Sequence, residues 1–400
     1  MNKRFDIVVV GAGVTGLTVA ALLSQCRFRD RLRLTVVDAA ARPRYEVGGD
    51  VALRVSAMST GSAELLESIG AWAQVSSTRA CAYEHMLVWD EAGDVDGAET
   101  LRFDAAEFAV PQLGFIVENE LLRHAILDVL DDAHIDLQFD SAIRSMQQHG
   151  QRYRLELTND RHLDADLVIG ADGARSFIRD SVNIKTRDWP YGQSAIVTHL
   201  QPEKSHRNTA WQRFLRDGPL GMLPLSDGRV SVVWSTAQER ADRAISASDD
   251  ELGEMLSEAS DFVLGNLKVA GPRGAFPLCA RHAVDYVLPA VALIGDAAHA
   301  VHPLAGQGAN LGLQDAAKLA DVIDRALGDG EHPGDRPVLR RYERARKGEN
   351  ATMMHFMTGL NSLFATDSAL VREFRATGMR LFNRSGPIRD RAVRVALGIQ

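Results

Sequence analysis

The first 38 residues contain the pattern that most constrains the fold. Phe5 to Val10 is a run of apolar, mostly β-branched residues interrupted only by Asp6, and it is typical of a strand buried on both faces. A glycine-rich turn follows, then a helix-like stretch from Leu17 to Leu23 and a second strand from Leu32 to Val37. Strand, glycine turn, helix and strand in this order predict a βαβ unit of a parallel α/β sheet.

The glycines of this turn have the spacing of a dinucleotide site. Gly11 allows a tight turn, Gly13 lets a pyrophosphate approach the backbone, and Gly16 lets the helix pack closely on the strand. Asp38 ends the second strand, where a carboxylate can accept both ribose hydroxyls and would repel a 2′-phosphate. The pattern therefore predicts FAD or NAD on a Rossmann-like fold, and the alternative is a glycine turn without a ligand.

Composition excludes several other classes of protein. The chain has 400 residues and a formal net charge of -8, without an extended basic face, so no nucleic-acid partner is expected. Its three cysteines lie far apart, which predicts neither a disulfide framework nor a cysteine metal site. We see no apolar export signal and no run long enough to span a bilayer, so a cytoplasmic protein is expected.

Two later segments repeat the arrangement of a strand followed by a polar turn. Within Leu163–Asp180, Asp172 follows a strand, and it could either contact a nucleotide or simply cap the next helix. Within Leu293–Ala316, Asp296 stands at a strand tip, where ligands gather in parallel sheets and where it could accept a ribityl hydroxyl. A helix is expected over Leu311–Leu319, and its start could stabilise negative charge on a reduced flavin.

Taken in order, these motifs resemble those of the class A flavoprotein aromatic hydroxylases of the para-hydroxybenzoate hydroxylase fold. The stretches "GADGARSFIR", "GDAAHAVHPLAGQGANLG" and "FIVENELLR" carry the resemblance, which is closest to the ubiquinone-biosynthesis flavin hydroxylases. It implies non-covalent FAD, NAD(P)H as a transient electron donor, and a flavin C4a-hydroperoxide formed with O2. It also implies that the product is a prenylated phenol hydroxylated on its aromatic ring.

The resemblance also assigns candidate site residues. The cofactor-binding candidates are Gly11, Gly13, Gly16, Asp38, Arg54, Arg123, Asp172, Asp296, Gly306, Gly308 and Asn310. The candidates beside the reacting groups, taken as catalytic, are His302, Pro303 and Gly308. Arg54 and Arg123 could instead be ordinary surface arginines. No metal site is expected: Asp296, His299 and His302 are spaced by three, but Pro303 interrupts a regular helix there.

The expected fold is α/β, with a Rossmann-like FAD-binding domain, an inserted antiparallel-sheet substrate domain and a C-terminal helical region. We expect the FAD-binding domain over residues 1–76, 118–180 and 284–324, the substrate domain over 77–117 and 184–283, and the helical region over 325–400. The alternating patterns "SAIVTHL" and "RVSVVWS" predict antiparallel strands that cover the flavin.

The tail and the partners leave alternatives open. From residue 355 to 399, large apolar residues alternate with arginines, which suits either contact with the inner face of a membrane or packing on the FAD-binding domain or a sister subunit. Proteins of a biosynthetic complex and a homo-oligomer are further candidate partners. The rival functions are a same-fold hydroxylase of a soluble phenol, a flavin-dependent reductase, and a non-catalytic FAD-binding scaffold.

Overall fold

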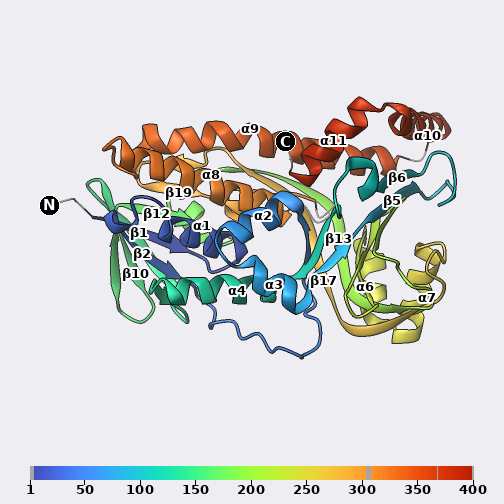
Figure 1. The fold of residues 1–400 in the computed structure, drawn as a ribbon, viewed down its shortest axis with the longest axis horizontal. Helices are drawn as coiled ribbons and strands as arrows, with labels where there is room; N and C mark the ends of the chain where they lie inside the picture. The colour runs from blue at the N-terminus through green and yellow to red at the C-terminus, as the bar shows by residue number, and fades with distance from the viewer. Residues whose placement is uncertain (1–3, 303–307, 367, 399–400) are drawn as a thin grey trace.

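The computed structural model describes residues 4–302, 308–366 and 368–398. Figure 1 shows a parallel sheet at one end of the molecule and an antiparallel sheet at the other, with two long helices along one side. The expected α/β class with a C-terminal helical region is confirmed. The domain boundaries given above remain a prediction.

The first sheet contains the N-terminal βαβ unit. Its strands, in spatial order, are β18 (Val287–Leu288), β19 (Val291–Leu293), β12 (Leu167–Gly170), β1 (Phe5–Val10), β2 (Leu32–Val37) and β8 (Asp136–Gln138). All pairs except β18–β19 are parallel. β1 and β2 have the predicted bounds, and every residue of β1 except Asp6 is apolar and buried.

Helices cover both faces of this sheet. They include α1 (Val14–Ser24), α4 (Asn119–Asp132) and α8 (Gly308–Gly328), and α1 packs against both of the others. α1 is apolar almost all round, as expected for a helix held between other elements. The remaining short elements on this side are α2 (Thr60–Ser68), α3 (Trp72–Arg79), α5 (Phe177–Ser181), η1 (Arg29–Arg31) and η3 (Gly295–Ala297).

The second large sheet is mainly antiparallel. Its strands, in spatial order, are β20 (His299–Ala300), β17 (Leu267–Ala283), β13 (Thr186–Pro202), β16 (Val230–Ala237), β15 (Gly218–Pro224), β14 (Thr209–Leu215), β5 (His85–Asp90) and β6 (Leu101–Asp104). Only the β14–β5 pair among these is parallel within the part of the chain described. Helices α6 (Gln238–Ser246) and α7 (Asp249–Ala259) pack on β13, β16 and β17.

Two three-stranded sheets complete the strands. One contains, in spatial order, β3 (Val55–Ser59), β7 (Gly114–Glu118) and β4 (Cys81–Tyr83). The other contains β11 (His162–Ala165), β10 (Arg152–Leu157) and β9 (Ile143–His149). The 3-10 helix η2 (Ala105–Phe108) follows β6.

The C-terminal region is helical, as expected. The helices are α9 (Arg336–Ala365), α10 (Ala369–Arg384) and α11 (Pro387–Leu397). α9 starts with Pro337 in its first turn, a position where the missing N–H of proline costs nothing. It runs beside α8, and α10 and α11 lie against the outer end of the antiparallel sheet (Figure 1).

Candidate functional site

Three motifs that are far apart in the sequence meet at the N-terminus of α1. Gly11 has a φ of +107°, and a Cβ there would lie 2.3 Å from the carbonyl oxygen of Ala171. The side chain of Thr15 fills the space where a Cβ of Gly295 or of Gly312 would stand. Because only glycine permits these approaches, the sequence brings the turn after β1, the turn after β12 and the start of α8 together.

Gly13 differs from the other glycines of this turn. Its φ of -75° suits any residue, and nothing described lies within 4 Å of the position that a Cβ would take. Gly13 is the N-cap of α1 and offers no side chain to the first N–H groups of that helix. The protein itself therefore does not require glycine here, whereas an anion on the helix N-terminus would. This open cradle fits the pyrophosphate of FAD.

Asp38 and Arg123 hold the glycine turn from two sides. The N–H of Ala12 donates to Asp38 Oδ2 (2.6 Å), and the N–H of Ala40 donates to Oδ1 (2.7 Å). Arg123 of α4 donates from Nε to the carbonyl of Ala12 (2.9 Å), so it is more than a surface arginine. Each carboxylate oxygen of Asp38 keeps a lone pair with which to accept a ribose hydroxyl.

Asp296 lies in η3, directly after β19. The residue is exposed to solvent, although many protein atoms lie around its carboxylate. Burial raises the pKa of Asp296, and the charges of His299 and Arg54 oppose this effect. Arg54 is therefore close enough to Asp296 to act on it electrostatically, although the two residues are far apart in the sequence.

Asp172 caps the helix that follows it. Its carboxylate accepts from the hydroxyl of Ser176 (2.6 Å) and from the N–H of Ile178 (3.0 Å). Burial raises its pKa, and these hydrogen bonds oppose the rise. These contacts are those of a residue that caps a helix, which was the alternative to a nucleotide contact. The predicted role of Asp172 toward nucleotides remains a prediction. Asp172 nevertheless adjoins the glycine turn, because its Cα would lie 2.9 Å from a Cβ at Gly11.

His302 is buried beside an aromatic ring. It is 1% exposed, its ring meets that of Tyr191 edge to face at 4.9 Å, and neither ring nitrogen has a hydrogen-bond partner among the residues described. Burial lowers the pKa of His302 to about 4, so the imidazole is neutral at pH 7. Pro303 and Gly306 lie outside the described residues.

Asn310 fastens the first turn of α8 to β3. Its Oδ1 accepts from the N–H of Ser59 (3.0 Å), and its Nδ2 donates to the carbonyl of Ala57 (2.8 Å). At Gly308, the first residue of α8, no atom of the residues that the structure describes lies within 4 Å of the position that a Cβ would take. Asn310 thus contacts protein backbone and fixes the direction of the helix start, which is a structural contact that the sequence pattern did not predict.

The sequence analysis missed a buried ionic network beneath this site. Asp315 of α8 is fully buried and accepts from His299 Nε2 (2.5 Å), from Arg346 Nε (2.9 Å), from Asn350 Nδ2 (3.0 Å) and from the N–H of Gly295 (3.1 Å). Burial acts to raise the pKa of Asp315, but the charges of His299 and Arg346 outweigh it and hold the pKa below its usual value. The available signal was one acidic residue on the apolar face of α8.

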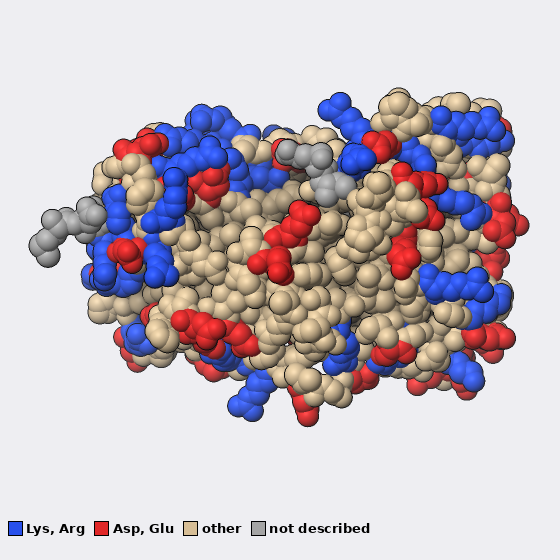
Figure 2. All heavy atoms as spheres, viewed as in Figure 1, with Lys and Arg blue, Asp and Glu red and all other residues tan. Residues whose placement is uncertain are grey.

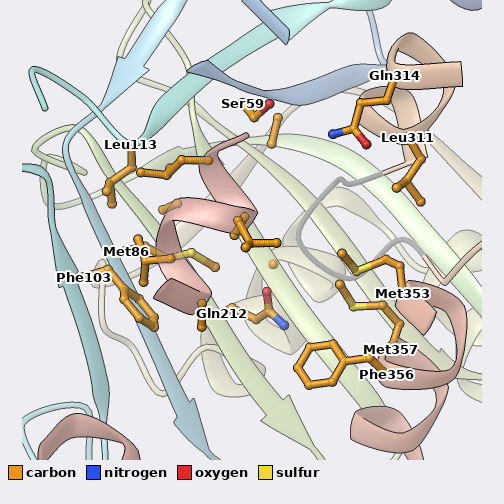
Figure 3. A pocket seen from close by; sticks show the side chains of 18 of the residues that line it. Ser59, Met86, Phe103, Leu113, Gln212, Leu311, Gln314, Met353, Phe356 and Met357 are labelled. Atoms are coloured by element: carbon orange, nitrogen blue, oxygen red, sulfur yellow. The ribbon is translucent and has the colours of Figure 1, made fainter. Parts of the chain in front are cut away.

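A cavity of about 1330 Å³ extends from α8 to the C-terminal helices. Figure 3 shows Met86 and Phe103 of β5 and β6 on one side, and Met353, Phe356 and Met357 of α9 on the other. Leu311 and Gln314 of α8, together with Ser59, lie at a further end, next to the anchor made by Asn310 (Figure 3). Most of its lining is apolar, and part of its wall is the inner face of α11, including Val393 and Leu397.

Comparisons with known proteins agree with this geometry. Residues 4–356 match the family described as FAD binding domain. The chain is 34% identical over 403 residues to 3-demethoxyubiquinol 3-hydroxylase of Escherichia coli, with 100% of both chains covered. It is 32% identical over 437 residues to the human mitochondrial ubiquinone biosynthesis monooxygenase COQ6, covering 98% of this chain and 92% of that one.

Solved structures show the same fold at lower identity. PqsL of Pseudomonas aeruginosa in complex with 2-aminobenzoylacetate has a TM-score of 0.76 at 23% identity, covering 94% of this chain and 99% of that one. HpxO of Klebsiella pneumoniae, complexed with FAD and uric acid, has a TM-score of 0.73 at 17% identity, covering 95% and 94%. The resemblance seen in the motifs is confirmed, and the chain belongs to the FAD binding domain family of flavoprotein hydroxylases.

Proposed function

We propose that this flavoprotein hydroxylase inserts one oxygen atom of O2 into the ring of a prenylated phenol in ubiquinone biosynthesis, with NAD(P)H as the electron donor. One structural observation supports this substrate above all. The cavity continues from the start of α8 to the C-terminal helices, and its lining is mainly apolar. A long apolar chain attached to a phenol ring fits that shape, and full-length relatives are named for ubiquinone biosynthesis.

The proposed cofactor site uses residues from all three motifs. Gly11, Gly13 and Gly16 leave room for the pyrophosphate at the α1 N-terminus, and Asp38 is assigned to the ribose. Arg123 braces the glycine turn. Arg54 and Asp296, which interact electrostatically, are assigned to the ribityl side, with Asp172 nearby. FAD bound there supplies both the electron transfer and the activation of oxygen.

The chain's own part in the reaction is to position the ring and to exclude water. An apolar cavity cannot hydrogen-bond water well, so it keeps the reacting ring dry. We assign the ring to the end formed by Leu311 and Gln314, because this end adjoins the first turn of α8. His302, Pro303 and Gly308 are assigned to the same side of the flavin. His302 is neutral at pH 7, so it adds no charge there.

The proposal includes a transient nicotinamide site, because the sequence offers no second GxGxxG turn. It places the enzyme in the cytoplasm, with contact at the inner face of a membrane and with proteins of a biosynthetic complex or a sister subunit as candidate partners. No helix in the described part of the chain has the length and apolar character needed to span a bilayer.

The test is oxygen insertion by the purified, FAD-loaded protein. NAD(P)H oxidation, O2 uptake and product mass would be followed with a prenylated phenol in detergent, using labelled O2. One labelled oxygen atom in the ring per NAD(P)H is expected. A reductase would reduce the substrate without oxygen label, a scaffold would consume neither O2 nor NAD(P)H, and a soluble-phenol hydroxylase would prefer the phenol without its prenyl chain. Any of these three results would overturn the proposal.

A further inference from the structure

The C-terminal helices carry an unusual share of the exposed apolar surface. Of eleven large apolar side chains exposed in the described residues, six lie between the second half of α9 and the end of α11. On α10, Leu370, Phe374 and Leu381 are 84%, 70% and 63% exposed. At ~3.6 residues per turn these positions fall within about 40° of one another on the helix. α10 therefore has one continuous apolar strip.

This strip points away from the protein. On α10 the buried residues are Arg375 and Met379, which lie on the opposite side of the helix. Arg375 holds that inner side in place, because its Nε lies 2.9 Å from the carboxylate of Asp90 with both side chains largely buried. The Arg375–Asp90 ion pair therefore keeps the apolar strip of α10 facing outward, where the rest of the described structure does not cover it.

α11 also has an inward and an outward apolar face, and its outward face borders the cavity. Its buried residues Val393 and Leu397 pack inward, whereas Ile388 and Val395 are 68% and 63% exposed. Ile388 and Val395 also line the cavity, as does Phe356 of α9, which is 57% exposed. Side chains that line a cavity and are also exposed form its rim. The mouth of the cavity is therefore rimmed by apolar side chains and opens beside the apolar strip of α10.

Charge indicates what covers this surface. Residues 366 to 400 contain seven arginines and three acidic residues, although the whole chain has a formal charge of -8. Arg384 and Arg391 are exposed on α10 and α11. In Figure 2, basic side chains flank uncharged surface at the end where Figure 1 places these two helices. A second copy of this surface would bring like charges together, whereas an anionic lipid surface matches both the apolar strips and the arginines.

We propose that the outer faces of α10 and α11 dock on an anionic bilayer, so that the cavity mouth opens into the lipid and the prenyl chain enters from the side. This inference rests on the proposed function for its substrate, but the docking itself does not need the substrate. An anionic surface attracts the basic residues, and the apolar side chains leave water when they insert, so both contribute to binding. α11 would then be the partition between the membrane and the cavity.

The binding test uses the full-length, FAD-loaded protein and vesicles of phosphatidylcholine, with or without phosphatidylglycerol. The variant Leu370→Ser/Phe374→Ser/Leu381→Ser removes the α10 strip, and Val47→Ser/Phe262→Ser removes exposed apolar surface elsewhere as the matched control. We expect co-sedimentation of the wild type with anionic vesicles that weakens in high salt, at least tenfold weaker binding of the triple variant, and wild-type binding of the control.

Two results would overturn the docking proposal: a wild type that does not bind anionic vesicles, or a triple variant that binds like the wild type. A triple variant that turns a dimer into a monomer, without a change in vesicle binding, would identify the strip as a self-association surface and would also overturn the docking proposal.

A second assay compares hydroxylation of the same prenylated phenol in vesicles and in detergent micelles. The triple variant should lose at least tenfold in kcat/KM only in vesicles. Absence of hydroxylation by the wild type in micelles would instead refute the proposed function.

Discussion

Individual glycines of the turn after β1 serve two different purposes. Gly11 and Gly16 are required by the fold, because a Cβ would lie 2.3 Å and 2.0 Å from backbone oxygens. Gly13 has free space and an ordinary φ. We therefore expect Gly13→Val to keep the melting temperature of the FAD-free protein within a few degrees while abolishing FAD retention, because the side chain occupies the pyrophosphate site.

Gly16→Val serves as the contrasting variant and should lower the melting temperature of the FAD-free protein strongly. Thermal unfolding monitored by circular dichroism, together with flavin absorbance after gel filtration, measures both effects. Full FAD occupancy of a folded Gly13→Val protein would remove this turn from the cofactor site.

His302 gives a prediction about pH at the same scale. Its pKa of about 4 in the folded protein lies below the ordinary value of ~6.5, so the unfolded chain binds more protons between these two pH values. Stability must therefore fall as the pH drops from ~6.5 toward 4, by about 2 kcal/mol at pH 5 for this group. The variant His302→Phe keeps an aromatic ring against Tyr191 but cannot be protonated, so it removes this pH-dependent loss of stability.

Urea unfolding of FAD-free protein at pH 7 and pH 5 tests this expectation. The variant should lose less stability than the wild type over this interval, and the exposed His162→Phe should behave like the wild type. Identical losses for His302→Phe and the wild type would show that His302 is already protonated or solvated in the folded state.

Among the structural elements, β3 and α8 are joined by the side chain of Asn310. Asn310→Ala leaves the N–H of Ser59 and the carbonyl of Ala57 without these bonds in a buried place. Each such group costs roughly 1–3 kcal/mol, so the free energy of unfolding should fall by about 2–6 kcal/mol. FAD affinity should fall as well, because the first turn of α8 loses its fixed direction.

Asn383→Ala is the matched control, because its amide donates one hydrogen bond to Thr100 far from the site. It should leave FAD affinity unchanged. Denaturant unfolding and flavin fluorescence titration provide the two measurements. If Asn310→Ala binds FAD like the wild type, the start of α8 does not need this anchor to contact the flavin.

The elements differ in how far the sequence could predict them. β1 and β2 were predictable to the residue, because mostly apolar stretches that end at Gly11 and at Asp38 are local signals. The C-terminal region was predicted to be helical, but the bounds of its helices were not, since the first half of α9 is polar and looks like surface sequence. The bond from Asp315 to Arg346 joins residues 31 positions apart, and the choice of such a partner depends on how α8 and α9 pack. No periodicity in one segment contains that information.

For the whole molecule, the cavity is the feature that no single element determines. Its walls come from β5 and β6, from α9 and from α11, which adjoin only after the chain has folded. The glycine turn could identify a dinucleotide site from 38 residues, but the shape offered to a substrate depends on nearly the whole chain. The tail could be recognised as apolar and basic, whereas its position over the cavity mouth required the structure.

A substitution that narrows the cavity should therefore discriminate substrates by chain length. Gly348 of α9 lines the cavity and has open space where a Cβ would stand, so Gly348→Phe should fill part of it without strain. Gly359 lies on the same helix with the same open space but does not line the cavity, which makes Gly359→Phe the matched control. Replacing glycine inside a helix favours the helix by up to ~1 kcal/mol, so neither variant should unfold.

We expect Gly348→Phe to lower kcat/KM at least tenfold, or ~1.4 kcal/mol, for a phenol with three isoprene units, and less than threefold for the phenol with none. The control should keep the wild-type dependence on chain length. The measurement is product formation across a series of chain lengths in one detergent, and an equal loss for all substrates in Gly348→Phe would show that the prenyl chain does not pass this helix.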